Sequence, residues 1–139
     1  MRKTFLLVLV TLILLSLLTS CGGNEPDKPV VHAILFYSPS CGHCHKVMTE
    51  DLPPLTRTHG KQLQILEVDT TTSQGQALFY AALDHFGIES AGVPMMVVGD
   101  VVLRGSVDIP EQLPGLIETG LASGGIDWPA IPGFVPPGG

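Results

Sequence analysis

Two of the three cysteines and two of the five histidines of this 139-residue chain lie in one short segment, FYSPSCGHCHKVM, at positions 36–48. Cys41 and Cys44 stand three positions apart, with His43 between them and His45 directly after. This string fits three kinds of chemistry: a redox pair of cysteines, a CxxCH haem-attachment site, or a Cys/His metal site. The remainder of the chain has to decide among them.

A helix is expected from Gly42 onward, which would place Cys41 at the start of that helix. Unbonded backbone N–H groups and the positive end of the helix dipole meet at such a position, and both favour a thiolate over a thiol. The thiolate is the nucleophile of disulfide chemistry. The three-residue spacing puts Cys44 about one helical turn away, close enough for its sulfur to displace a partner from a mixed disulfide on Cys41. Such a pair supplies an attacking and a resolving cysteine.

The first 20 residues have the layout of an export signal. Two basic residues precede an apolar run over 5–18, and this run is shorter than the roughly 20 residues of a membrane-spanning helix. It ends in Leu-Thr-Ser-Cys at 18–21, which resembles the bacterial lipobox, a sequence cut before its cysteine after that cysteine receives a lipid. We therefore expect a signal peptide at 1–20 and a lipid anchor on Cys21. The alternative is an uncleaved signal anchor.

The charge balance excludes some partners. Removal of residues 1–20 would leave five basic residues against thirteen acidic ones, a net charge of −8. A surface of this sign does not attract nucleic acid or anionic lipid, so acyl chains on Cys21 would have to supply the membrane attachment. With Cys21 lipidated, Cys41 and Cys44 remain as a pair. The segment 21–29 is rich in Gly, Pro and charge and is expected to be a flexible tether.

Beyond the tether, the hydrophobic pattern predicts alternating strands and helices. Short β-branched or alternating runs indicate strands, apolar stripes at helical spacing indicate helices, and Gly99-Asp100 forms a short turn between two apolar runs. Pro53 and Pro54 should kink or break the first helix, while Pro110 is placed near the first turn of the last one. The expected elements are strands at 30–37, 62–69, 93–98 and 101–105 and helices at 42–58, 73–87 and 109–123.

The order β-α-β-α-β-β-α predicts an α/β fold. Parallel strands joined by helices, followed by a hairpin and a closing helix, give a central mixed sheet that is covered on both faces. We expect this domain to span 30–122. The remaining segment 123–139 is rich in Gly and Pro, and it either docks on the domain through Trp128, Ile131 and Phe134 or remains a solvated tail.

In combination these motifs resemble the thioredoxin superfamily, and CGHC resembles the active site of protein disulfide isomerase domains. The likeness covers roughly residues 30–122: a strand, CGHC opening a helix, VDTT after a second strand, and GVP leading into a hairpin. It implies a thioredoxin fold in which Cys41 is the exposed attacking cysteine and Cys44 the buried resolving one. It also implies that Pro94 is a cis-proline facing the disulfide, and that the backbone at Val93 pairs with bound substrate as an extra strand.

His43 is the candidate for tuning the redox behaviour of the pair. It can donate a hydrogen bond to the Cys41 thiolate or, when protonated, stabilise it by charge. Stabilising the reduced form makes the disulfide a stronger oxidant. The alternative is a solvent-facing histidine without redox effect.

Two positions depart from the pattern of the relatives. Thioredoxin and disulfide isomerase domains usually carry a buried acid six residues before the first cysteine, and this chain has Leu35 there. Cys44 would then lose its proton to water or to another group. The residue directly before the first cysteine, commonly tryptophan, is Ser40. We therefore expect slower resolution and a less apolar docking surface than in the relatives.

Two rival interpretations use the same string of residues. Haem attachment fits CxxCH, but a c-type cytochrome would be mostly helical, and the candidate axial ligands Met95 and Met96 lie in an apolar strand pattern. A copper- or zinc-binding metallochaperone would use Cys41, Cys44 and a histidine, because thiolate and imidazole suit these metals. Both nearby histidines are too close in sequence to complete such a site comfortably. This metallochaperone is the alternative function.

The sequence therefore predicts an extracytoplasmic, membrane-anchored thiol-disulfide oxidoreductase that works through a Cys41–Cys44 disulfide, with no other cofactor and no metal. The expected partners are thiols or disulfides of exported proteins and a membrane redox partner that recharges the pair, and no nucleic acid. Because a donor at His43 and the uncharged Leu35 both favour the thiolate, oxidation or isomerisation of substrates is preferred to reduction.

Overall fold

The computed structural model describes residues 28–138, so the expected signal peptide, Cys21 and most of the tether lie outside the described residues. These residues form four strands, four α-helices and two short helical segments of other types. Within 28–138, no helix is both long enough and apolar enough to span a membrane. In chain order the elements are β1 (Val31–Tyr37), α2 (Gly42–Lys46), the π-helix η1 (Val47–Asp51), α3 (Leu52–His59), the 3-10 helix η2 (Gly60–Gln62), β2 (Leu63–Asp69), α4 (Ser73–His85), β3 (Met95–Val98), β4 (Val101–Arg104) and α5 (Gly105–Ala122).

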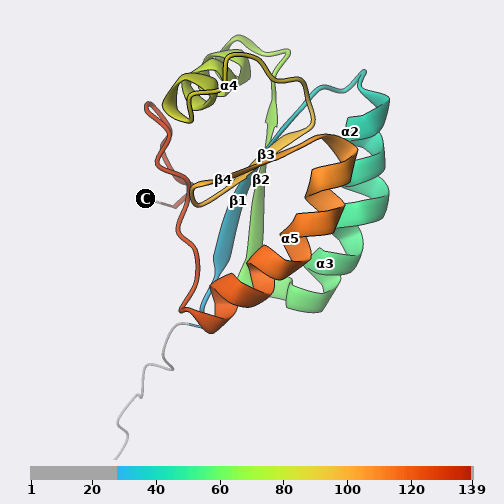
Figure 1. The fold of residues 1–139 in the computed structure, drawn as a ribbon, viewed down its shortest axis with the longest axis vertical. Coiled ribbons are helices and arrows are strands. Elements are labelled where there is room, and N and C mark those ends of the chain that lie inside the picture. Colours follow the sequence, from blue (N-terminus) through green and yellow to red (C-terminus); the bar gives the residue numbers. More distant parts are fainter. Residues whose placement is uncertain (1–27, 139) are drawn as a thin grey trace, which may run out of the picture.

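The strands form one sheet in the order β2-β1-β3-β4. β1 and β2 run parallel and are joined by the helical segment between them, whereas β3 is antiparallel to both β1 and β4. Figure 1 shows α2, α3 and α5 on one side of this sheet and α4 on the other. This order and these connections are those of a thioredoxin fold, so the predicted α/β fold with a mixed central sheet is confirmed.

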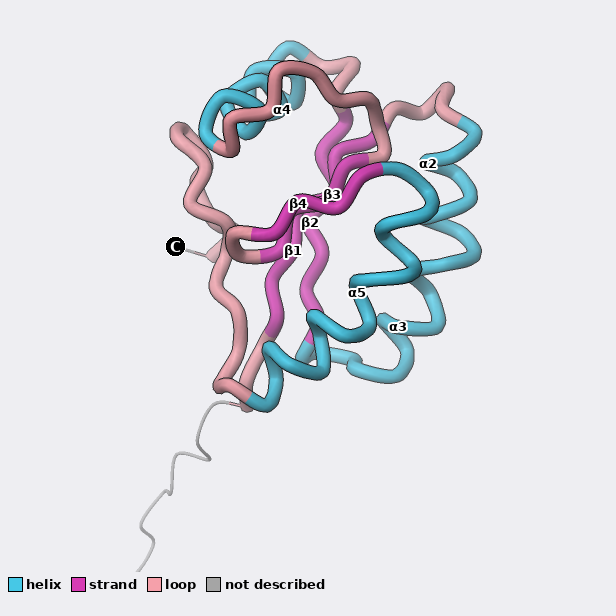
Figure 2. Tube along the Cα trace, viewed as in Figure 1, coloured by secondary structure: helices cyan, strands magenta, loops and turns pink. Residues whose placement is uncertain are grey.

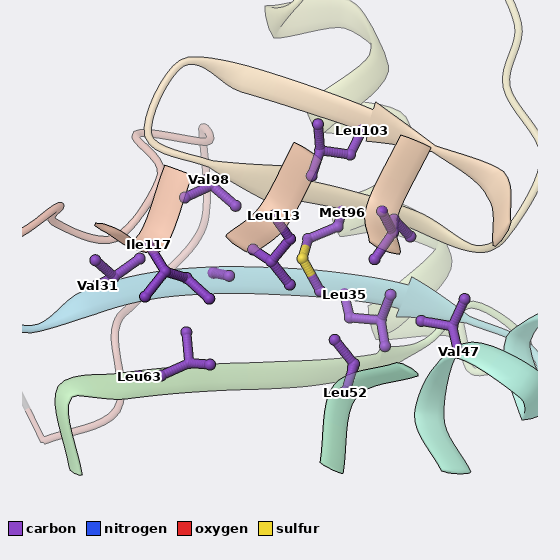
Figure 3. Close-up of a cluster of buried hydrophobic side chains, with 12 residues drawn as sticks. Val31, Leu35, Val47, Leu52, Leu63, Met96, Val98, Leu103, Leu113 and Ile117 are labelled. Atoms are coloured by element: carbon purple, nitrogen blue, oxygen red, sulfur yellow. The ribbon is translucent and has the colours of Figure 1, made fainter. Parts of the chain in front are cut away.

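The sheet is buried on both faces because its inner strands are apolar at successive positions. In β1, Leu35 faces the cluster beneath α3 and α5, and the neighbouring Phe36 faces the opposite cluster. Met96 and Met95 divide in the same way in β3, and both are fully buried. Figure 3 shows Leu35 and Met96 packed with side chains of α5 in the first cluster. The two methionines are therefore core residues of the sheet.

The face opposite α5 is covered by α4 and by the segment 123–138, which docks on the domain. Figure 2 shows this segment as a loop running along the side of the sheet away from α3 and α5. Ile126 extends the sheet: its N–H donates to the Val30 carbonyl at 2.8 Å, and its carbonyl accepts from the His32 N–H at 2.9 Å. The Trp128 ring packs at a tilt against the His32 ring, with 4.6 Å between their centroids, and Ile131 is only 4% exposed.

The first helical segment is interrupted ahead of its two prolines, as the sequence predicts. Pro53 and Pro54 lie in the first turn of α3, where a missing N–H costs least. The turn before them, η1, is π-helical. A π-helical turn inside a longer helix changes its direction and the phase of its side chains. The segment therefore begins at the cysteines as α2 and continues along the sheet as α3.

The closing helix starts four residues earlier than the sequence indicates. α5 begins at Gly105 rather than at 109, so Pro110 lies inside the helix together with Pro114 instead of near its first turn. Asp108 in the first turn accepts a hydrogen bond from the Arg104 N–H at 3.2 Å, while Arg104, the N-cap residue, makes no side-chain cap bond of its own. Burial of Ile109 and Leu113 in the core holds the helix together around the two prolines.

Candidate active site

Cys41 and Cys44 form a disulfide at the beginning of α2, with 5.2 Å between their Cα atoms. Cys41 is the N-cap of α2 and stays partly exposed, whereas Cys44 is 1% exposed. The Cys44 N–H donates to the Cys41 sulfur at 3.1 Å. An N–H donor and the start of a helix both stabilise negative charge on that sulfur once the disulfide is reduced. The accessible sulfur of the pair is thus also the one placed to become a thiolate.

The loop before β3 meets the disulfide from the other side. The peptide bond between Val93 and Pro94 is cis, as the resemblance implies, and Pro94 is buried. The Val93 carbonyl oxygen lies 3.5 Å from the Cys41 sulfur, although 52 residues separate the two in sequence. The oxidised sulfur has no proton to donate, so this is a contact in the disulfide form. It becomes a hydrogen bond only with a Cys41 thiol.

The Cys41 sulfur therefore has neighbours of opposite electrostatic effect. The Cys44 N–H favours the thiolate, and the Val93 carbonyl, an acceptor, favours the protonated thiol. The loop that carries this carbonyl lies at the surface, since Val93 is only partly buried and Gly92 before it is exposed. The structure thus brings three of the predicted site residues together: both cysteines and Val93.

His43 has a partner that the sequence analysis missed. Its ring is exposed, and its Nδ1 lies 3.1 Å from the hydroxyl oxygen of Ser106 in the first turn of α5. The expected partner was the Cys41 sulfur, and no hydrogen bond of the described residues joins the two. Ser106 lies 63 residues from His43 in the sequence, between the strand expected at 101–105 and the helix expected at 109–123. Because α5 begins at Gly105 instead, Ser106 belongs to its first turn and meets His43 at the start of α2.

The two positions that depart from the family pattern, Leu35 and Ser40, differ in burial. Leu35 is fully buried in the same apolar cluster as Val47 of η1, and no charged side chain of residues 28–138 is buried. Ser40, directly before the disulfide, is exposed. A buried acid that could take the Cys44 proton is therefore absent from the described part of the chain.

Surface cavities adjoin α4 on two sides. The smaller, of about 220 Å³, adjoins Val93 and lies between α4 and the loop before β3, with lining residues Thr70, Gln76, Phe79, Tyr80, Ala91, Gly92 and Val93. The larger, of about 500 Å³, lies between β2, α4 and the C-terminal segment and is lined by none of the residues around the disulfide. The larger cavity is therefore separate from the disulfide site. Across the described residues, no three His, Cys, Asp or Glu side chains are grouped as a metal site requires.

No model of a protein family matches this chain, and no curated protein matches it. Similar solved structures include a thioredoxin from Thermus thermophilus, with 21% identity, a TM-score of 0.48, and coverage of 65% of this chain and 73% of that one. A buckwheat glutaredoxin in complex with glutathione has 23% identity, a TM-score of 0.43, and coverage of 67% and 78%. Thioredoxin-2 of the malaria parasite has 19% identity and a TM-score of 0.43, with coverage of 68% of this chain and 86% of that one. The thioredoxin fold is recognised from the strand order of the chain itself.

Proposed function

We propose that this protein exchanges disulfides with other proteins through Cys41 and Cys44. The observation that carries the proposal is the asymmetry of the pair: Cys41 is partly exposed at a helix start and accepts an N–H hydrogen bond, while Cys44 is buried beside it. A disulfide that only stabilised the fold would need neither an accessible sulfur nor a donor directed at it. Exchange needs both.

In the reducing direction, the Cys41 thiolate attacks one sulfur of a client disulfide. A bond forms between the Cys41 sulfur and that client sulfur, and the other client sulfur leaves as a thiolate that takes up a proton. The Cys44 thiol then loses its proton and attacks the Cys41 sulfur, which restores the Cys41–Cys44 disulfide and releases the second client thiol. Two electrons pass from the protein to the client. The reverse sequence oxidises a client dithiol.

The partly exposed loop at Val93, directly before β3, supplies a place for the client backbone. Val93 is partly exposed, and its carbonyl lies 3.5 Å from the Cys41 sulfur. A client segment paired with this backbone as an extra strand would carry its own cysteine past Cys41. The exposed Tyr80 and the cavity of about 220 Å³ beside Val93 add apolar surface for a client side chain. This arrangement supports unfolded or extended polypeptide as the substrate class.

We place the reaction outside the cytoplasm, on a membrane, with substrate oxidation or isomerisation preferred to reduction. The export signal at 1–20 and the lipobox-like sequence ending in Cys21 support the location. The hydrogen bond from the Cys44 N–H to the Cys41 sulfur supports the direction, as does the absence of a buried acid among residues 28–138, because both favour the reduced pair. An oxidase of this kind needs a membrane redox partner that withdraws the two electrons.

Trapping of clients tests the proposal. Cys44→Ser should accumulate mixed disulfides between Cys41 and client proteins, because the attacking sulfur remains and the resolving one is gone. Cys41→Ser should accumulate almost none, since the remaining Cys44 is 1% exposed. The readout is a non-reducing gel followed by mass spectrometry of the linked peptides. Equal trapping by both variants, or stronger trapping by Cys41→Ser, would show that the two roles are assigned wrongly.

A further inference from the structure

We propose that Ser106 is a positioning residue of this site: its hydroxyl holds the His43 ring through Nδ1 and thereby directs the ring's other nitrogen, Nε2, as the donor available to sulfur. The inference rests on the proposed function, because it concerns how the Cys41–Cys44 pair is tuned. Its basis is the 3.1 Å contact between Ser106 Oγ and His43 Nδ1, which joins the starts of two different helices.

This contact closes a circuit of short contacts around the Cys41 sulfur. The sulfur lies 3.5 Å from the Val93 carbonyl oxygen. The carbonyl of the next residue, Pro94, accepts a hydrogen bond from the Gly105 N–H at 2.8 Å. Ser106, which follows Gly105 in α5, contacts the ring of His43. The members in order are Cys41, Val93, Pro94, Gly105, Ser106 and His43. Figure 1 shows the starts of α2 and α5 at the same end of the molecule, and the two helices are in contact. The His43 ring thus bounds the active site on its α5 side.

A serine hydroxyl suits this place because it both donates and accepts. When the hydroxyl donates to Nδ1 of a neutral imidazole, the ring proton is on Nε2, and when the ring is charged the hydroxyl accepts from Nδ1–H while Nε2 keeps its own proton. We assign the first arrangement to the neutral ring, so that Nε2 carries a proton in both states. A free histidine would divide its neutral form between two tautomers and several rotamers. Ser106 therefore keeps the ring in one orientation with a donor at Nε2.

The donor at Nε2 has two sulfur acceptors in the exchange reaction. One is the Cys41 thiolate of the reduced pair, and the other is the client sulfur that leaves when the mixed disulfide resolves. Loss of the Ser106 hydroxyl would leave His43 in place but release its ring. The reduced pair would then be less stabilised, and the disulfide would become a weaker oxidant.

The test is a double-mutant cycle on the full-length protein equilibrated with reduced and oxidised glutathione. Ser106→Ala should lower the equilibrium constant for oxidation of glutathione by about two- to tenfold, the range of one hydrogen bond. His43→Ala should lower it at least as much, and Ser106→Ala should add nothing in the His43→Ala background. Ser106→Thr keeps a hydroxyl and should restore the wild-type value. A pH titration of thiolate absorbance should show the matching change for Cys41.

Ser123→Ala is the matched control. Its hydroxyl, at the other end of the same helix, donates only to backbone carbonyls, so the equilibrium constant should not change. An unchanged constant in Ser106→Ala, or an equal shift with and without His43, would overturn the role of Ser106 and leave disulfide exchange intact. A wild-type disulfide that does not equilibrate with glutathione would overturn the proposed function, and this inference with it.

Discussion

At Cys41, two neighbours act on one sulfur in opposite directions. The Cys44 N–H at 3.1 Å stabilises a thiolate, and the Val93 carbonyl at 3.5 Å destabilises it. A client strand that pairs with Val93 would engage this carbonyl and so reduce its repulsion of the thiolate. Binding of a client and activation of the nucleophile would then be coupled at a single atom.

Gly75, in the first turn of α4, is a position where one added methyl group should lower stability. Its N–H donates to the Thr72 hydroxyl at 3.0 Å, which caps α4, and a Cβ at this position would collide with the backbone carbonyl of Asp69. Backbone cannot move aside as a flexible side chain can, so Gly75→Ala should lower the free energy of unfolding by about 1–3 kcal/mol. The midpoint of urea unfolding measures this.

Gly115 provides the control for that substitution. It lies exposed in α5 with no atom within 4 Å of an added Cβ, so Gly115→Ala should raise stability by about 0.5–1 kcal/mol through helix propensity. If Gly75→Ala proves as stable as Gly115→Ala, the close approach of Asp69 to α4 is wrong.

The sequence predicted the reactive residues of the site better than their surroundings. Cys41 and Cys44 follow from their own spacing, because a CxxC pair at a helix start is a local pattern. The contacts with Val93 and Ser106 come from segments 52 and 63 residues away, and only the fold brings these segments together. The resemblance to thioredoxin-like proteins supplied Val93, but nothing in the sequence marked the partner of His43.

At the scale of elements, the C-terminal segment 123–138 covers part of the sheet face on which α4 also packs. α4 is the one helix of the described residues on this face of the sheet, and Trp128, Ile131 and Phe134 pack against the same apolar cluster. Gly125 allows this path, because a Cβ there would meet the Val30 carbonyl oxygen at 2.6 Å. The sequence left docking and solvation open, since Gly- and Pro-rich composition is compatible with either.

Docking of this segment makes a prediction about stability. Ile131 is 4% exposed in an apolar cluster, so Ile131→Ala should cost about 2–4 kcal/mol of the free energy of unfolding. Val135, four residues further on, is 77% exposed, and Val135→Ala should change stability by no more than about 0.5 kcal/mol. Thermal and urea unfolding of both variants provide the comparison. An equal, small effect at both positions would mean that the segment is not part of the folded domain.

The helix boundaries show where the local effect of proline determines the structure and where packing in the core outweighs it. The π-helical turn before Pro53 and Pro54 could be anticipated as an interruption, because missing N–H groups are a property of the prolines themselves. The start of α5 could not, since two prolines inside a helix argue locally against it. Packing of Ile109 and Leu113 into the core outweighs that local penalty.

At the scale of the whole molecule, the proposed lipid anchor on Cys21 would supply a membrane attachment that the charge of the chain does not supply. A net charge of −8 after removal of 1–20 gives no attraction to anionic lipid. Cys21→Ala should abolish lipid labelling and leave the precursor uncleaved by the lipoprotein peptidase, so that the apolar run at 5–18 stays on the chain. Metabolic labelling with a fatty acid and intact mass spectrometry are the measurements. An unmodified wild-type chain that begins at Met1 would contradict the anchor.

The reduction potential of the Cys41–Cys44 pair tests the central claim, disulfide exchange, most directly. It is obtained by equilibrating the wild-type protein with glutathione and quantifying the free thiols of Cys41 and Cys44. We expect a potential nearer to that of protein disulfide isomerase, about −180 mV, than to that of thioredoxin, about −270 mV. A value close to −270 mV would keep the exchange reaction but make reduction its direction. A value below about −300 mV, typical of structural disulfides, would contradict the account and make the pair a staple of the fold.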